Sequence, residues 1–436
     1  MIFESGSEPV IEVGLLLAEK IEVCLHGNYS NKEKTFTNNI EITISDKGLV
    51  VDGNFYFEPD GLNLKPENDA TFTVKDVVFG IGFHWERLED LTFKGELGFK
   101  IEDRKIRLIN RVTLEDYLKS VISSEMSATA SNALLKAHAV MSRSWLIAQL
   151  IQKHKPDTHI ADASNEIIRW YDREDHSGFD VCADDHCQRY QGITRITNEK
   201  ALKAIEETRG LVLKFKDEIC DARFSKCCGG ITERFDTCWE EENPPYLQPV
   251  FDGTGTDTRN YYDEAGAKAF ILKDMDAFCN TSDTKILDQV LNDYDRETPA
   301  FFRWKEEMTA LEIKRLLKKK IGIEIGDILD LIPLDRGASG RIFRLKIVGS
   351  ENEITIGKEL EIRKALSESH LLSSAFVVDK ITDETRGSTL FKLHGAGWGH
   401  GVGLCQIGAA VMGEKGYSFE EILNHYFKQT SLEKIY

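Results

Sequence analysis

The chain has 436 residues, of which 41% are hydrophobic and 29% are charged, and its formal net charge at pH 7 is -18. A chain of this length buries one large core or two ordinary ones, so these values indicate a globular protein. The acidic balance, without a basic stripe carrying interleaved aromatic residues, excludes nucleic acid as a partner.

No apolar run approaches the roughly 20 residues that cross a bilayer, so we expect no transmembrane segment. The opening stretch MIFESGSEPVIEV has early acidic residues and lacks the cationic start and the small-residue cleavage site of an export signal. The sequence as written therefore shows no export signal, and on this evidence alone its compartment stays undecided.

From Val10 to about Lys100, short runs alternate apolar and polar residues and are separated by Gly, Asn and Asp turns. Alternation with a period of two is typical of half-buried strands. We therefore predict a β-rich N-terminal region over residues 1–105.

Helical patterns dominate from Leu114 to Lys153. Thr113 with Asp116 three residues later predicts a helix start, and a second helix with a small apolar face begins after Ser131. Glu125 falls in the polar, small-residue break between the two helices, where a carboxylic acid can face a cleft and donate a proton. The alternative is that Glu125 is one of the many solvated acids among the chain's 73 Asp and Glu residues.

The remainder of the chain mixes strands and helices without a regular βαβ alternation, which indicates an α+β fold. The expected elements are a helix over 198–208, strands over 210–215 and 219–225, a helix over 309–320, a hairpin over 341–357 and a helix from 358 to 366. Residues 251–299 are polar and acidic with few periodic apolar positions, so we expect a surface insertion there.

A glycine-rich loop over residues 394–409, HGAGWGHGVGLCQIGA, contains six glycines and leads into a helical run that ends at Gly416. Such glycine density lets the backbone adopt positive φ and approach a ligand. The loop has neither a phosphate-binding ending nor a dinucleotide fingerprint. Trp398 and His400 suit a sugar platform, where an aromatic face stacks on a pyranose ring and an imidazole bonds its hydroxyl groups. The alternative is a tight structural turn with Trp398 in the core.

The nine cysteines are odd in number and are not arranged as a small disulfide scaffold, so metal ligation or reduced thiols fit as well as bridges. Four candidate metal ligands follow one another in the chain: His176, Cys182, His186 and Cys187. Their spacing matches no common zinc ribbon or finger. On spacing alone, a loose loop or a Cys182–Cys187 bridge remains open.

Together these motifs resemble the sporulation stage II protein D (SpoIID/LytB) family, which has an EM dipeptide after a YL-xx-V helix, a KA-x-AV-x-(A/S)R-(S/T) helix and a closing GWGHGVG-x-(S)Q-(Y)GA run. In this chain the matching positions are Tyr117, Leu118, Val121, Glu125, Met126, Lys136, Ala137, Ala139, Val140, Arg143, Ser144 and residues 397–409. The blocks CCGGITE, PYL and IRKAL and the pair His425-Tyr426 resemble later family elements. The resemblance covers about 106–435, interrupted by 251–299, and implies one SpoIID/LytB-like domain over 106–436.

The resemblance implies a lytic transglycosylase that cleaves the MurNAc–GlcNAc bond of peptidoglycan, with Glu125 as its catalytic acid. A single carboxyl group suffices for this reaction, whereas ordinary glycosidases use two, and the sequence shows no second acid in a comparable setting. The implied substrate-binding residues are Arg143, Tyr190, Trp398, His400 and Gln406. For Tyr190 core packing is the alternative, and Arg143 is expected either on the substrate or in holding the fold.

Some members of this family bind zinc through two histidines and two cysteines in nearly this arrangement, so the resemblance favours a closed, structural zinc site at His176, Cys182, His186 and Cys187. It also places the protein in the cell envelope or periplasm, in contact with peptidoglycan strands and a cell-wall amidase. The lack of a recognisable export signal suggests an alternative hypothesis, an intracellular protein that uses this fold for another purpose.

Several residues depart from the family pattern near the expected cleft. Cys405 and Ile407 replace Ser and Tyr, Ser225 replaces a histidine, and Cys227 and Cys228 replace serines or threonines. These changes bear on specificity and on activity, so a non-catalytic glycan-binding or amidase-enhancer (LytB-type) module is the alternative function. The acidic net charge is unfavourable for an anionic glycan, which Arg143, Arg223 and Lys226 are expected to offset locally.

Overall fold

The protein is represented by a computed structural model that describes residues 6–32, 34–56, 61–80, 86–127, 129–152, 165–170, 176, 178–184, 186–196, 199–255, 261–291, 295, 300–383 and 388–436. Strands account for 38% of it and helices for 25%, which confirms the α+β class. None of the helices in these ranges is long and apolar enough to cross a membrane.

The N-terminal region is a large and mostly antiparallel sheet, as the alternating pattern predicted. Its strands are β1 (Val10–Ala18), β2 (Lys20–Ser30), β3 (Thr35–Ser45), β4 (Gly48–Val51), β5 (Asn54–Tyr56), β6 (Leu62–Pro66), β7 (Thr71–Phe79), β8 (Arg87–Lys94), β9 (Glu96–Glu102), β10 (Lys105–Thr113) and β12 (Val181–Cys182). The order is β12-β1-β10-β9-β6-β2-β3-β4-β5, and β7 pairs with both β2 and β8. The short β12 adds the Cys/His segment to the sheet edge, parallel to β1.

Helix α1 (Leu114–Glu125) directly follows β10 in the chain. It is followed by α2 (Asn132–Gln152) and, after β12, by α3 (Glu199–Glu207). Thr113 caps α1 by accepting a hydrogen bond from the Asp116 amide, which confirms the predicted start. The predicted ends at Lys153 and Asn198 lie outside the described residues. Core residues of α1 and α2 pack in the same hydrophobic cluster as those of the N-terminal sheet.

Small sheets and two helices form the layer around α2. They are β13 (Leu211–Phe215), β14 (Glu218–Ile219), β15 (Phe224–Ser225), β22 (Leu404–Cys405), β23 (Ser431–Lys434), α8 (Gln406–Glu414) and α9 (Phe419–Tyr426). Strand β13 pairs with β14 and β23, and β15 pairs in parallel with β22. The pairing of β15 with β22 brings Phe224 and Ser225, just before the CCGG segment (residues 227–230), beside Leu404 and Cys405 of the glycine-rich loop.

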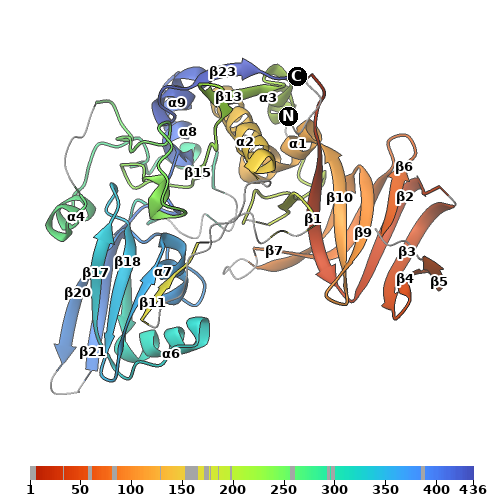
Figure 1. Cartoon of the computed structure of the whole chain (residues 1–436). Helices are drawn as coiled ribbons and strands as arrows, with labels where there is room; N and C mark the ends of the chain where they lie inside the picture. Colours follow the sequence, from red (N-terminus) through yellow and green to blue (C-terminus); the bar gives the residue numbers. More distant parts are fainter. Residues whose placement is uncertain are drawn as a thin grey trace.

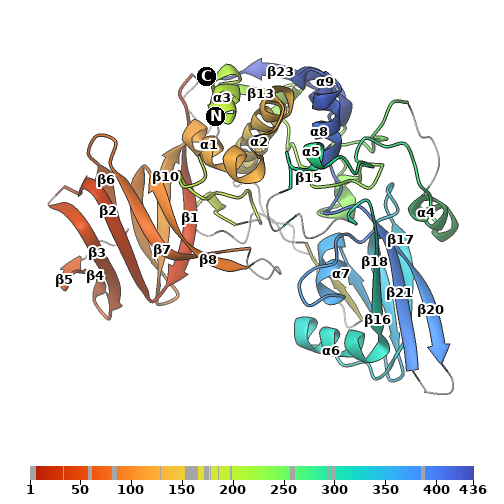
Figure 2. The ribbon, with the colours of Figure 1, turned by 180° about the vertical axis from the view of Figure 1, so that it is seen from behind.

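A separate body of strands lies at the other end of the molecule (Figures 1 and 2). It contains β11 (Glu166–Ile168), β16 (Arg303–Thr309), β17 (Ile328–Arg336), β18 (Ile342–Gly349), β19 (Glu353–Gly357), β20 (Phe376–Asp383) and β21 (Ser388–Ala396), with α6 (Ala310–Ile321) and α7 (Glu359–Ala365). Strands β18 and β19 form the predicted hairpin, and Thr309 and Glu312 form a capping box at α6. This body has its own hydrophobic cluster.

The segment 251–299, expected at the surface, contributes to the interior instead. It carries α4 (Glu264–Ile271) and the one-turn helix α5 (Thr284–Leu287), and η2 (Phe235–Thr237) precedes it. Phe270, Phe278, Cys279 and Val290 are all buried. The prediction of a surface insertion is wrong for these residues, because scattered apolar side chains without helical or strand periodicity still fill gaps between neighbouring elements.

Candidate functional site

A cavity of about 370 Å³ lies where the helices around α2, the Cys/His segment, α7 and the glycine-rich loop meet. Seven of the ten residues singled out from the sequence line it: Glu125, His176, His186, Cys187, Trp398, His400 and Gln406. Glu125 and the lining residues of the glycine-rich loop, more than 270 positions apart in the chain, therefore line one concave surface. A site formed by these two motifs requires this.

Glu125 is the last residue of α1. The helix ends because Met126 adopts an extended conformation, with φ -120° and ψ 141°, and the Ser127 amide then donates to the Gln289 carbonyl at 2.9 Å. The Glu125 side chain is 7% exposed and lines the cavity. A nearly buried carboxyl group at the wall of a cavity has the placement that a proton donor needs.

The glycine-rich loop wraps around a buried arginine. Gly401 has φ 79°, and a Cβ atom there would lie 2.5 Å from the Arg341 guanidinium. Arg341 is fully buried and donates hydrogen bonds to the carbonyls of Gly399, at 3.0 Å, and Cys228, at 3.1 Å. The positive φ predicted from the glycine density is thus confirmed, and its cause is the close approach of the backbone to a side chain of this protein.

Trp398 is both buried and part of the cavity wall. It is 7% exposed, and its backbone exchanges two hydrogen bonds with Cys227, at 2.8 and 3.0 Å. Its low exposure agrees with the core alternative, and its place in the cavity wall leaves the platform as a proposal.

His400 presents a neutral imidazole to the cavity. Its Nδ1 accepts a hydrogen bond from the Val402 amide at 3.0 Å. Burial, reinforced by the positive charges of Arg223 and Arg341, lowers the pKa of His400 well below its usual value. At neutral pH this residue is therefore a hydrogen-bonding and packing group, not a cation.

Gln406 belongs to a buried polar chain behind the cavity. Its Nε2 lies 3.1 Å from His138 Nε2, and His138 Nδ1 lies 3.1 Å from Ser142 Oγ. Since the amide nitrogen donates, His138 Nε2 accepts and Nδ1 carries the proton. Burial, together with the charge of Lys226, lowers the pKa of His138 to about 3, so the ring is neutral. This chain holds the Gln406 amide in one orientation.

The cavity wall carries charged side chains of both signs. The charged side chains of its wall are the cationic Arg189, Arg223, Lys226, Arg363 and Lys364 and the acidic Glu125, Asp180 and Asp184. Asp180 Oδ2 accepts from the Glu12 amide at 2.9 Å, and Asp184 Oδ1 from the Gly80 amide at 2.8 Å. The two extra acids are therefore tied to the N-terminal region. Four of the five cations are paired as well: Arg189 and Lys226 with Asp295, Arg223 with Asp221, and Arg363 with Glu359.

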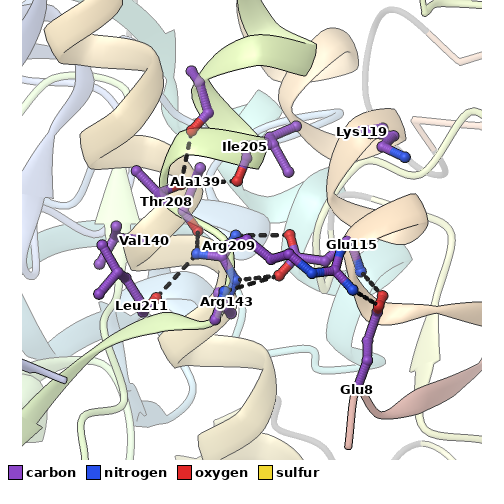
Figure 3. A network of polar contacts seen from close by, with 12 residues as sticks. Glu8, Glu115, Lys119, Ala139, Val140, Arg143, Ile205, Thr208, Arg209 and Leu211 are labelled. Atoms are coloured by element: carbon purple, nitrogen blue, oxygen red, sulfur yellow. Dashed lines mark hydrogen bonds and ion pairs between the residues drawn. The ribbon is translucent and has the colours of Figure 1, made fainter. Parts of the chain in front are cut away.

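Arg143 does not line the cavity. Its side chain points toward Glu115 (Figure 3). It is fully buried and donates two hydrogen bonds to Glu115, from Nε at 2.9 Å and from Nη2 at 2.8 Å, with a third to the Leu211 carbonyl at 3.0 Å. The geometry thus contradicts substrate contact and agrees with the other expected role, in holding the fold. Arg143 was misplaced because one helical pattern does not show which neighbour its polar face meets.

Tyr190 is also in the interior, away from the cavity. It is 2% exposed, stacks between Phe93 and Tyr117 with ring centroids 5.8 and 5.2 Å away, and donates to Asn110 Oδ1 at 2.5 Å. The core-packing alternative is the one that the geometry matches, because both ring faces and the hydroxyl group already have partners.

The four predicted metal ligands converge. One donor atom from each of His176, Cys182, His186 and Cys187 lies within 4.8 Å of the others, and His176 Nε2 is 3.1 Å from Cys187 Sγ. Two imidazoles and two thiols form a donor set that suits tetrahedral zinc. Convergence of all four favours metal ligation over the loose-loop alternative, and both cysteines are free thiols in the structure.

Several wall residues were not anticipated as site residues. Trp239, Arg363 and His370 line the cavity, and Trp239 packs against His400 with ring centroids 5.0 Å apart. Arg363 lies on α7 and His370 follows it, both before the glycine-rich loop in the chain. The pattern there indicated only a helix over 358–366, so no sequence signal distinguished these two residues from surface residues.

Two family models match parts of this chain. Residues 102–215 match the model of the Stage II sporulation protein family, and residues 233–403 match a domain of unknown function, DUF8618. The amidase enhancer of Bacillus subtilis is 26% identical over 328 residues, which are 72% of this chain. Stage II sporulation protein D of the same organism is 21% identical over 332 residues, covering 75% of this chain and 76% of that protein.

An uncharacterized protein of Brachyspira hyodysenteriae is 24% identical over 398 residues and is covered to 88%, as is this chain. The matched part covers only 40% of the length of the amidase enhancer. The first family match contains Glu125 and the metal-ligand set, whereas the glycine-rich loop lies in and just beyond the second.

Proposed function

We infer that this chain, which belongs to the SpoIID/LytB family, cleaves the glycan strands of peptidoglycan by a lytic transglycosylase reaction. Family membership supports a role related to the cell wall. The specific reaction is our proposal, and the observation that carries it is the position of Glu125 in the wall of the cavity that Trp398 and His400 also line.

In the proposed reaction, Glu125 acts twice. Its carboxyl group first donates a proton to the oxygen of the MurNAc–GlcNAc bond as that bond breaks. The resulting carboxylate then takes the proton of the sugar's own C6 hydroxyl, whose oxygen bonds to C1 and closes an anhydro ring. The proton returns to Glu125, so the acid is regenerated and no water is consumed.

The other wall residues would hold the substrate. The exposed part of Trp398 would stack on a pyranose ring, and the neutral His400 and the oriented Gln406 amide would bond hydroxyl or N-acetyl groups. Arg223 and Lys226, which are also paired with Asp221 and Asp295, would supply the positive charge for the lactyl carboxylates.

We also propose that His176, Cys182, His186 and Cys187 hold a zinc ion with a structural role. Four protein donors leave no open position for water. Strand β12 anchors this segment to β1, with the Asp180 amide bonding the Glu12 carbonyl at 2.9 Å. The metal would thus fix the cavity wall between Glu125 and the N-terminal sheet.

The test is product analysis with peptidoglycan glycans that lack stem peptides. We expect the protein to release anhydro-muramyl ends and Glu125→Gln to abolish them while keeping its fold by circular dichroism. The matched control is Glu207→Gln, because Glu207 is the last residue of α3, as Glu125 is of α1, but lies at the surface. Products with reducing ends would show instead that water is the acceptor, with Asp180 or Asp184 as a second acid.

The match to the amidase enhancer favours one other function, a module that binds glycan or stimulates an amidase without cutting. The departures Cys405 and Ile407 lie beside Gln406 and are consistent with it. Glycans that co-sediment with the protein but remain uncut, equally for wild type and Glu125→Gln, would support this module and overturn the transglycosylase. Stimulation of a purified cell-wall amidase would identify its partner.

A further inference from the structure

A second group of metal-ligand side chains lies in the interior, apart from the Cys/His segment. One donor atom from each of Cys228, Asp252, Cys279 and Cys405 lies within 4.8 Å of the others, and all four residues are at most 1% exposed. The four come from distant parts of the chain, so local sequence does not explain their meeting. Three thiols and one carboxylate are a donor set that thiophilic divalent ions bind.

The distance between the sulfur atoms fits metal coordination better than a disulfide. Cys228 Sγ and Cys279 Sγ are 3.7 Å apart. Zinc–sulfur bonds of about 2.3 Å in a tetrahedral arrangement place two sulfur atoms about 3.8 Å apart, whereas a disulfide needs about 2.05 Å. All three cysteines of the group are free thiols.

The surroundings already orient the donors. The Cys228 amide donates to Cys405 Sγ at 3.2 Å, and the Gly230 amide donates to Cys228 Sγ at 3.4 Å. Amide donors of this kind stabilise thiolates, and they provide the outer support that metal sites use. The sulfur atoms are thus placed in an environment prepared for negative charge.

The carboxylate of Asp252 is also held by hydrogen bonds. Its Oδ1 accepts from the Tyr426 hydroxyl at 2.6 Å and its Oδ2 from the Cys279 amide at 2.8 Å. Gly408 makes room for it, because a Cβ atom there would lie 2.3 Å from Asp252 Oδ1. Both hydrogen-bond donors are uncharged, so a fully buried carboxylate here has a large desolvation cost that a bound cation would offset.

Arg303 lies near Cys279 and Cys228 but does not fill this role. Its guanidinium donates to the backbone carbonyls of Gly229, at 2.9 Å, and Lys273, at 3.0 Å. Arg303 therefore lies beside the group as outer support and leaves its centre to a different cation.

We propose that Cys228, Asp252, Cys279 and Cys405 bind a second zinc ion, with a structural role. Binding releases the three thiol protons to solvent as the thiolates coordinate, and no redox step is involved. The ion would join the segment around 252–279 to the CCGG segment and to the N-terminus of α8. Ser225, Lys226 and Gln406 line the cavity and lie close in sequence to the ligands Cys228 and Cys405. The ion would therefore stabilise this part of the cavity wall from the protein interior.

Metal content tests the proposal independently of any activity. The 436-residue protein, purified with a non-thiol reductant and supplied with zinc, should hold two equivalents by elemental analysis. Cys182→Ser and Cys279→Ser should each hold one, and the double variant none. Cys220→Ser is the matched control, because Cys220 is equally buried but outside both groups, and it should keep two.

X-ray absorption of zinc in Cys182→Ser then isolates the second site and should show three sulfur neighbours and one oxygen. Cys227→Ser should keep both ions, although the Cys227 thiol lies near those of Cys279 and Cys405. Four sulfur neighbours, or loss of one ion in Cys227→Ser, would overturn the assigned ligands.

If Cys279→Ser does not fold, the wild-type and Cys182→Ser measurements still decide the matter. A single equivalent in wild type that Cys182→Ser removes would overturn the second site and leave the first intact. A wild-type mass lower by two hydrogens, with the Cys228 and Cys279 peptides linked, would replace the metal with a disulfide.

Discussion

The guanidinium of Arg143 and the carboxylate of Glu115 form a two-pronged, fully buried ion pair between the middle of α2 and the first turn of α1 (Figure 3). Glu115 also accepts hydrogen bonds from the Gly210 amide at 3.2 Å and from the Tyr436 hydroxyl at 2.6 Å. Glu125 lies at the other end of α1. The pair therefore fixes the orientation of the helix that presents the candidate acid.

Removing one partner of this pair should destabilise the protein strongly. Arg143→Ala leaves Glu115 buried without its cation, and we expect a loss of about 3–5 kcal/mol in the free energy of unfolding. Urea denaturation followed by circular dichroism measures it. Lys203→Ala, which breaks an exposed pair with Glu207 on α3, is the control and should lose less than about 1 kcal/mol. Equal losses in the two variants would contradict this assignment.

The same pair predicts a dependence on pH. Burial alone would raise the pKa of Glu115, but the hydrogen bonds and charge of Arg143 outweigh it and hold the pKa below its usual 4.5. The stabilisation is therefore complete above about pH 4.5 and is lost as the pH falls through the folded-state value. In urea titrations the stability difference between wild type and Glu115→Gln should shrink below pH 4.5. A difference that grows toward acid would reverse the assigned sign.

Tyr190→Phe separates packing from substrate binding. The substitution keeps the stacked ring but leaves Asn110 Oδ1 without its donor, so we expect a loss of about 1–3 kcal/mol in stability. Glycan cleavage by the folded variant should keep the wild-type KM, since Tyr190 does not line the cavity. A raised KM with unchanged stability would restore the substrate-side role.

Trp398→Ala should weaken glycan binding. Loss of the stacking face is expected to reduce affinity for peptide-free glycan about tenfold, which corresponds to about 1.4 kcal/mol. Co-sedimentation or calorimetry with the Glu125→Gln protein measures binding without turnover. Trp398→Phe keeps an aromatic face and should recover most of the affinity. Alanine and phenylalanine variants that bind as well as the parent would exclude the platform.

His186→Ala should release the zinc of the Cys/His segment. Loss of one of four donors lowers zinc retention, and elemental analysis should find one equivalent fewer than in wild type. Because β12 and this segment form part of the cavity wall, limited proteolysis should cut residues 176–189 faster in the variant. His26→Ala, in the N-terminal sheet, is the matched control. Unchanged zinc in His186→Ala would exclude that residue as a ligand.

Local signals in the sequence predicted much of the secondary structure. Thr113 and Thr309 are hydrogen-bonding caps, so they marked the starts of α1 and α6 from side-chain chemistry alone. The alternation before Lys100 predicted the N-terminal sheet. The segment 251–299 was misjudged, because its buried residues are few and separated by polar ones, and some of them, such as Phe278 and Cys279, join the main core formed by distant parts of the chain.

The sequence by itself determined which groups carry chemistry: an acid at a helix break, a glycine-rich loop bearing Trp398 and His400, and a Cys/His segment. These signals are short-range, since a cap, a break or a glycine turn depends on a few adjacent residues. Only the tertiary structure decided that Glu125 and Trp398 share a cavity, that Arg143 faces Glu115, and that Asp252 meets three cysteines. Those relationships depend on which faces of distant elements pack together, and a pattern along one element does not specify its partner.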